Sequence, residues 1–169
     1  SMSAQMDDNS ANGTNLAGDY AVAMGYNTAA SGYTSTAMGH STTASGNIST
    51  AMGRNTTASG LYSTAMGRYT TASGDFSTAM GYSTTASGTY AVAMGSYTTA
   101  SQAYSTAMGR STTASGIYST AMGYSTTASD YASLVIGQYN LAGATVTSSA
   151  TAFNGANTAF VIGNGINSG

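Results

Sequence analysis

The sequence contains no cysteine, proline or tryptophan, and only 5% of its 169 residues are charged. The absence of cysteine excludes disulfides and thiolate metal sites, and it leaves the redox compartment open. Three scattered arginines are too few for a basic patch, so the sequence predicts no nucleic-acid partner. It shows no signal-peptide pattern and no apolar run of about 18 residues, so this segment is not expected to insert into a membrane.

The residues that carry most enzyme chemistry are nearly absent as well. The chain has one histidine, His40, and no glutamate, so neither a Ser-His-Asp triad nor a paired-carboxylate site is expected. Phosphate-binding glycine motifs are missing. Asp7, Asp8 and Asn9 form an acidic cluster without the alternating Asp spacing of a calcium loop. We therefore predict a protein that is not an enzyme, with no catalytic residue, cofactor or metal ion.

Apolar residues are nevertheless plentiful. Hydrophobic residues make up 41% of the chain, which contains 13 Tyr and 10 Met. Disordered chains are usually rich in proline and charge, and this composition is the opposite. The chain therefore has enough apolar surface to fold, either as one ordinary domain or as an elongated repeat array.

A 14-residue repeat organises most of the sequence. Each unit reads approximately x-Tyr-Ser-Thr-Ala-Met-Gly-x-x-Thr-Thr-Ala-Ser-Gly, and eight copies fill residues 19–130 after a half copy at residues 14–18. Frequent glycine, serine and threonine, with no apolar stripe at three- and four-residue spacing, argue against a helix. A fixed period of this length is typical of a solenoid.

Each unit predicts two strands of about five residues joined by tight turns, for example residues 35–39 and 42–46. Successive side chains of a strand point to opposite faces, so Thr36 and Met38 share one face and Ala37 lies on the other. In the second strand, Thr42 and Ala44 share one face and Thr43 and Ser45 share the other, for the same reason.

Glycine closes most units and is expected to supply the positive φ that a turn requires. Gly46 is one example. Gln102 and Asp130 replace this glycine in two copies, so their turns are expected to differ.

Stacking the coils at a strand spacing of about 4.8 Å pairs each strand with its equivalents and forms two parallel sheets. The predicted fold is all-β, a parallel β-roll or solenoid of two-stranded coils with a thin interior of small residues. The methionines then form one column on the outward face of the first strand, beside a column of Thr and Val. An alternative places the methionines in the roll's own core and the small residues outside.

An outward apolar column of this length needs a cover, because soluble monomers rarely expose such a patch. We predict that neighbouring chains share it, although these physical arguments do not choose between two and three chains. The predicted inter-chain residues are Val22, Met24, Thr36, Met38, Met52, Met66, Met80, Val92, Met94, Met108, Met122, Leu134 and Ile136.

A variable turn slot follows each Met-Gly pair and is the candidate binding surface. Tyr and Arg recur there at coil spacing, and both are common in binding hot spots. The alternative is that they only cover the sheet edge and keep the rod soluble. A second aromatic column, at the other turn, is expected to serve packing. The candidate ligand residues are Tyr26, His40, Arg54, Arg68, Tyr82, Arg110 and Tyr124.

The repeat resembles the head repeat of YadA-like trimeric autotransporter adhesins, whose motif reads approximately Asn-Ser-Val-Ala-Ile-Gly. The nearest local matches are Tyr-Ala-Val-Ala-Met-Gly at residues 20–25 and 90–95, and the likeness extends over residues 19–137 and again at 159–163. The resemblance implies a left-handed β-roll and a homotrimer whose apolar column packs around one axis. It also implies display on a bacterial surface and adhesion to host matrix or cells. The sequence departs from the family by using Met for Ile and mostly Thr for Val.

This resemblance leads to a division of the chain and to its expected location. Residues 1–13 are a polar, frayed segment whose Ser-Met start is typical of a cloning scar, residues 14–137 are the array, and residues 138–169 are a cap or a transition to a further module. The expected site is the bacterial cell surface, with outer-membrane anchoring through a region absent here, or else a phage tail or secreted fibre.

Three functions fit the array at this point. The first is an adhesin head that binds extracellular matrix or other cell-surface ligands. The second is a passive spacer in a surface or phage-tail fibre. The third is an ice-binding solenoid, because Thr43, Ser45 and their equivalents form a regular column of hydroxyl groups.

Overall fold

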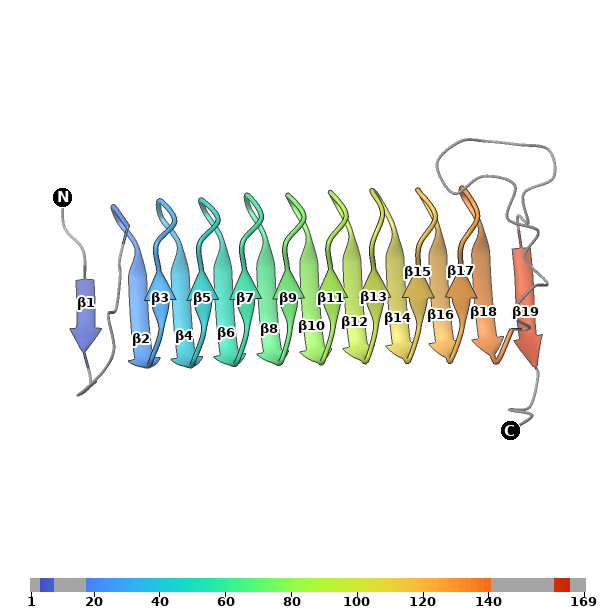
Figure 1. The fold of residues 1–169 in the computed structure, drawn as a ribbon, viewed down its shortest axis with the longest axis horizontal. Coiled ribbons are helices and arrows are strands. Elements are labelled where there is room, and N and C mark those ends of the chain that lie inside the picture. The colour runs from blue at the N-terminus through green and yellow to red at the C-terminus, as the bar shows by residue number, and fades with distance from the viewer. Residues whose placement is uncertain (1–3, 8–17, 141–159, 165–169) are drawn as a thin grey trace.

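A computed structural model describes residues 4–7, 18–140 and 160–164, in which all regular structure is β-strand. The coils follow one another along a single axis, so that the chain forms an elongated roll with long strands on one side and short strands on the other (Figure 1). Each of the eight repeat coils contributes two strands, as the repeat predicts, but one is long and the other short; the predicted parallel β-solenoid is confirmed.

The long strands form an 11-stranded parallel sheet in which equivalent residues of successive coils pair directly. Residue 78, for example, pairs with residue 64, and residue 80 with residue 66. In sheet order the strands are β1 (Ala4–Asp7), β2 (Val22–Tyr26), β4 (Thr36–His40), β6 (Thr50–Arg54), β8 (Thr64–Arg68), β10 (Thr78–Tyr82), β12 (Val92–Ser96), β14 (Thr106–Arg110), β16 (Thr120–Tyr124), β18 (Leu134–Gln138) and β19 (Phe160–Asn164).

The short strands form a second, 8-stranded parallel sheet, and each has two residues instead of the expected five. They are shorter because the chain turns directly after them: Ser49 N donates to Gly46 O at 3.3 Å and closes the turn. The strands are β3 (Ala29–Ala30), β5 (Thr43–Ala44), β7 (Thr57–Ala58), β9 (Thr71–Ala72), β11 (Thr85–Ala86), β13 (Thr99–Ala100), β15 (Thr113–Ala114) and β17 (Thr127–Ala128).

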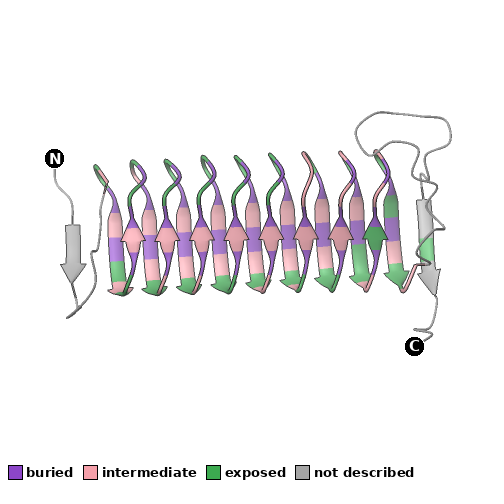
Figure 2. Cartoon of the chain, in the orientation of Figure 1, coloured by how far each residue is buried: buried purple, intermediate pink, exposed green. Residues whose placement is uncertain are grey.

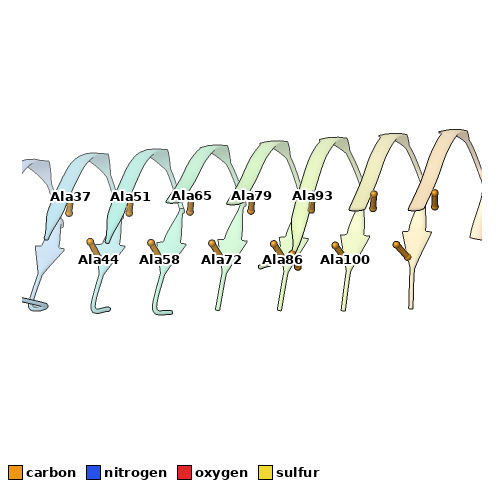
Figure 3. Packing of buried hydrophobic residues seen from close by; sticks show 14 of the residues in the cluster. Ala37, Ala44, Ala51, Ala58, Ala65, Ala72, Ala79, Ala86, Ala93 and Ala100 are labelled. Carbon is orange, nitrogen blue, oxygen red and sulfur yellow. The ribbon is translucent and has the colours of Figure 1, made fainter. Parts of the chain in front are cut away.

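The core between the two sheets is built almost entirely of alanine. Ala37 on a long strand and Ala44 on the next short strand are both fully buried, and their equivalents repeat along the roll (Figure 3). Ser35 and Thr42 complete the inward positions of the same coil and are buried as well. The predicted thin interior is confirmed, and no room is left inside for a methionine column.

The turns differ from the sequence-based expectation. Gly46 does not have a left-handed φ; the positive φ values fall instead on non-glycine residues such as Ser41 (53°) and Ile48 (56°), and on the glycine after each methionine, as at Gly67 (120°). Gly46 is needed for a different reason, because a Cβ at this position would lie 2.0 Å from Gly60 O in the next coil. The prediction of a positive φ at Gly46 was therefore wrong.

The two units without that glycine keep the same turn. Ser105 N donates to Gln102 O at 3.2 Å, and Ser133 N donates to Asp130 O at 3.2 Å, as in the glycine-containing coils. The serine hydroxyls bond the same carbonyl oxygens, at 2.6 Å for Ser105 and 2.9 Å for Ser133. At these hydrogen bonds the expected difference between the turns is not found.

Both ends of the long sheet extend beyond the eight repeats. Residues Ala4–Asp7, expected to be frayed, form β1 and pair with β2 so that Met6 falls opposite Met24. At the other end Leu134 pairs with Phe160 and Ile136 with Ile162, so the segment at 159–163 that resembles the repeat continues its register. The expectations for the half copy before Gly18, for Asp8 and Asn9, and for a cap at residues 141–159 lie outside the described residues.

Candidate oligomer face and binding edge

The methionines lie on the outer face of the long sheet. Each sits at the centre of a long strand, and neighbours pair directly, as Met66 does with Met80. Met24 and Met122, near the two ends, are 39% and 38% exposed, whereas the six between them are half-buried. The alternative that placed the methionines inside the roll is wrong.

The neighbouring Thr and Val column shares that face. Val22, Thr36 and Val92 are half-buried and begin their strands, two residues before each methionine. Along each long strand from β2 to β16 a buried alanine lies between these less buried positions (Figure 2). Leu134 is 36% exposed and Ile162 is 65% exposed, so the face becomes more apolar toward the C-terminal end. All of the predicted inter-chain residues therefore lie on one face, which we call the methionine face.

The candidate ligand residues lie together at one edge of the roll. Tyr26, His40, Arg54, Arg68 and the corresponding residues of later coils each form the last residue of a long strand. Direct pairing of the strands sets them side by side, with Arg54 opposite Arg68 and Tyr26 opposite His40. The three arginines, which look scattered in the sequence, thus line a single edge, which we call the cationic edge.

Aromatic rings order the side chains of this edge. The Arg68 guanidinium carbon lies 4.9 Å from the Tyr69 ring centroid and 5.6 Å from that of Tyr82. Arg110 lies 5.4 Å from the Tyr124 ring, and Tyr26 stacks on His40 at 4.9 Å. Cation–π contacts of this kind hold a flexible arginine over a fixed ring surface.

These contacts shift several pKa values. The side chains of Arg68 and Tyr69 form a hydrogen bond, and the positive guanidinium attracts the ionised phenol. Both effects raise the pKa of Arg68 and lower the pKa of Tyr69. A hydrogen bond with Tyr82 raises the pKa of Tyr97. The edge therefore holds permanent positive charge beside a phenol that gives up its proton more readily than an isolated tyrosine.

Three tyrosines of the cationic edge escaped sequence reasoning. Tyr69, Tyr97 and Tyr139 occupy the left-handed slot just after the strand, where other coils have Asn or Ser. Tyr69 and Tyr97 contact Tyr82 at 6.0 and 5.2 Å, and Tyr139 contacts Tyr124 at 5.0 Å, all edge-to-face. The signal that could have revealed them is the recurrence of Tyr in the slot after the Arg/Tyr column.

The opposite edge carries the second aromatic column, which is a continuous stack. The rings of Tyr62, Phe76, Tyr90, Tyr104 and Tyr118 follow one another at 4.8–5.0 Å, with interplanar angles of 7–13°. Stacking covers the ring faces and leaves the ring edges toward solvent, so that each ring stays close to half exposed. This geometry fits the expectation that the column serves packing.

The described strands and turns carry neither a metal-binding cluster nor a membrane-spanning helix. No group of three or more His, Cys, Asp or Glu residues that could hold a metal ion occurs among the described residues. That part of the chain also has no helix long and apolar enough to span a bilayer. His40 Nδ1 lies 3.1 Å from Ser41 Oγ, on the exposed turn of the cationic edge.

Comparison with known families gives the array its identity. The family model described as "YadA head domain repeat", which spans two repeats, matches residues 30–56, 44–70, 58–84, 72–98, 86–112 and 114–140. Together these matches cover more than half of the chain. The chain belongs to the YadA head repeat family. Domains of this family are surface-exposed parts of trimeric adhesins, a structural and non-enzymatic class. No curated protein matches the chain.

Proposed function

We propose that this YadA head segment is the trimeric head or stalk of a bacterial surface adhesin and binds extracellular matrix or other cell-surface ligands. The proposed setting is the bacterial outer surface, and a phage-tail or secreted fibre is the alternative. One observation carries the proposal: an unbroken apolar column faces outward from a sheet whose inner side is already filled by alanine.

The methionine face supports association because no described segment of the chain packs over it. Burying a whole methionine side chain is worth about 1.5–3 kcal/mol, and no methionine of the column is more than 39% exposed in one chain, so about a third of that value per residue is a generous allowance. Eight methionines therefore offer, as an upper bound, on the order of 4–8 kcal/mol per chain. Cyclic symmetry brings three identical faces together around one axis, with Val22, Thr36, Leu134 and their equivalents beside the methionines.

Charged substitutions test this arrangement. In the double variant Met66→Asp and Met80→Asp, two carboxylates replace adjacent residues of the buried column, so we expect the trimer and the folded structure to be lost together. The matched control, Ser73→Asp and Ser87→Asp, places the same charges on exposed positions of the other sheet and should leave assembly intact. Equal sedimentation of both variants as trimers would contradict a role for the methionine face.

The cationic edge is the proposed ligand surface, with Tyr26, His40, Arg54, Arg68 and their equivalents as contact residues. Three chains repeat the edge three times, so weak contacts at several coils add up to firm attachment. Binding of the purified trimer to immobilised matrix proteins and to whole cells tests this function. Attachment to neither surface, by a trimer shown to be folded, would count against adhesion.

The regularity of the coils favours one second candidate, a passive spacer. Every long strand from β2 to β18 keeps the same residue-to-residue pairing, so the array is a rod of uniform section that can hold another domain away from a surface. Deleting whole 14-residue units would then shorten the reach of the parent protein without weakening any binding. The ice-binding alternative remains a prediction and is tested by thermal hysteresis.

A further inference from the structure

The cationic edge carries an unfavourable arrangement of charge within the chain itself. All three arginines and the single histidine occupy the same slot of the repeat, at the end of a long strand. Arg54 and Arg68 are direct partners on neighbouring strands, and both side chains are exposed. Like charges placed directly opposite each other destabilise a sheet. A local arrangement that works against folding points to a role in binding.

Three of the four described aspartates lie elsewhere in the roll, and the fourth, Asp7, ends β1 opposite Gly25, three strands from Arg54. Asp19 and Asp75 occupy the same slot of the turn at the opposite edge, and Asp75 Oδ1 accepts a hydrogen bond from Leu61 N at 2.9 Å. Asp130 is fully buried at a turn between coils. Between Arg54 and Arg110 the sequence has one carboxylate, Asp75, and it lies at the edge opposite the guanidinium groups.

Aromatic rings beside Arg68 and Arg110 restrict these side chains to positions in which they can bind an anion. The Arg68 guanidinium carbon lies near two tyrosine rings and that of Arg110 near one, and the Arg68 side chain also hydrogen-bonds Tyr69. A guanidinium held in this way still presents N–H donors in its own plane, and these suit the paired oxygens of a sulfate or carboxylate. Charge-assisted hydrogen bonds of this kind are the strong ones.

We propose that the cationic edge binds an anionic polysaccharide, with sulfate or carboxylate groups on Arg54, Arg68 and Arg110 and sugar hydroxyls between them. Arg54 and Arg110 are four coils apart, about 19 Å at the strand spacing, and exposed or half-exposed Tyr and Ser residues lie between them. Widely spaced anionic groups on a hydroxylated polymer match this sparse pattern. The proposal names the ligand class of the adhesin proposed above and rests on that function.

The other common polyanions fit less well. Duplex DNA carries one charge per about 1.7 Å, so about eleven phosphates would face three guanidinium groups over the same length. Anionic membranes are recognised by clusters of about four to eight basic residues, and the chain has three arginines.

Binding to dextran sulfate, with unsulfated dextran of the same length as the reference, tests the proposal on the purified protein. We expect the wild-type protein to bind only the sulfated polymer, with an affinity that falls as salt rises. Arg54→Gln and Arg68→Gln should each weaken binding about tenfold or more, and the double variant about a hundredfold, because each removes a charge-assisted contact. Single-stranded DNA and phosphatidylserine vesicles serve as the competing anions.

Asn47→Asp is the matched control. It changes the net charge by the same amount as Arg68→Gln but at the opposite edge, where Asn47 Oδ1 accepts a hydrogen bond from Tyr33 N just as Asp75 does from Leu61 N. This variant should bind dextran sulfate like the wild type. Equal weakening by Asn47→Asp and Arg68→Gln would show a net-charge effect and overturn the proposal, as would tighter binding to DNA or to vesicles.

Sedimentation of each protein separates this proposal from the function on which it rests. A folded trimer that attaches to cells but does not bind dextran sulfate would overturn the proposed polysaccharide ligand and leave the adhesin function standing. A chain that does not assemble into trimers would overturn the adhesin function. Weaker binding of dextran sulfate by Arg54→Gln and Arg68→Gln variants that remain trimeric would support both proposals.

Discussion

Replacing Gly67 with alanine should destabilise the roll more than the same change at Gly60, although both sites are equally crowded. A Cβ at Gly67 would lie 2.1 Å from Gly81 O, and a Cβ at Gly60 would lie 2.0 Å from Gly74 O. Only Gly67 also has a left-handed φ, of 120°. The chain already places a side chain, Gln102, in the slot that is equivalent to Gly60.

Comparing the two sites isolates the free-energy cost of the left-handed conformation at Gly67, because the cost of crowding is common to both. Crowding of the added Cβ against the backbone oxygen of the next coil costs about 1–3 kcal/mol at either site. A backbone conformation that is essentially restricted to glycine adds about 1–3 kcal/mol at Gly67 alone. One kcal/mol corresponds to about 2–4 °C for a protein of this size, so the Gly67→Ala variant should unfold about 6 °C below Gly60→Ala.

Thermal unfolding followed by far-UV circular dichroism measures this difference. Both variants and the wild type must be compared at one chain concentration, because the stability of an oligomer depends on concentration. Equal melting temperatures for the two variants, or a lower one for Gly60→Ala, would refute the assignment of the left-handed conformation to the glycine after methionine.

Three further predictions concern buried hydroxyls, ring stacking and titration. Thr70 Oγ1 is buried and has no hydrogen-bond partner in the described structure, so Thr70→Val should raise the free energy of unfolding by about 1 kcal/mol. Ser63→Ala removes a buried 2.7 Å hydrogen bond to Gly60 O and should lower the free energy of unfolding by about 1 kcal/mol. Urea unfolding measures both. Phe76→Ala breaks two ring stacks, at 4.9 and 4.8 Å, and should cost about 1–3 kcal/mol in the same assay, and no loss would show that the ladder does not stabilise the fold. In spectrophotometric titration, Tyr69→Phe should remove a phenol that ionises at lower pH than the other tyrosines, because the neighbouring guanidinium lowers its pKa. Tyr97→Phe should remove one that ionises at higher pH, because its hydrogen bond with Tyr82 raises its pKa. The opposite order would contradict the hydrogen bonds of the cationic edge.

The repeat made most of the fold predictable from sequence. A strict 14-residue period fixes which residues stack, and the alternation of Ala37 with Thr36 and Met38 fixes which face is buried. The pairing of Leu134 with Phe160 followed from the same slots, even though the intervening segment breaks the period. Where every coil repeats the same pattern, a register error in one coil would conflict with all the others.

The turns could not be predicted in the same way. Gly46 looks like a turn glycine, yet it is required by the close approach of the next coil, and the left-handed conformation falls on Ile48, a residue type that ordinarily avoids it. A coil closed in 14 residues sets these dihedral angles through its stacking on its neighbours, which outweighs the local preference of the residue. Single-residue propensity therefore points to the wrong position.

The sequence predicted where the candidate site lies but not all of the residues that form it. The slot shared by Arg54, Arg68 and Arg110 was visible in the sequence, and the structure turns that shared slot into an edge. Tyr69 and Tyr97 were missed because they belong to the following slot, which is usually small and polar. Their contacts with the edge depend on how the chain turns after the strand.

Sedimentation equilibrium of the purified chain tests the central claim most directly, because that claim is that the methionine face is shared among three copies. One chain has a mass of 16.7 kDa, so a trimer has a mass of about 50 kDa. We predict that larger mass over the whole range of micromolar concentrations, with folded β-structure throughout. A stable, well-folded species of 16.7 kDa at the highest concentration would contradict the account.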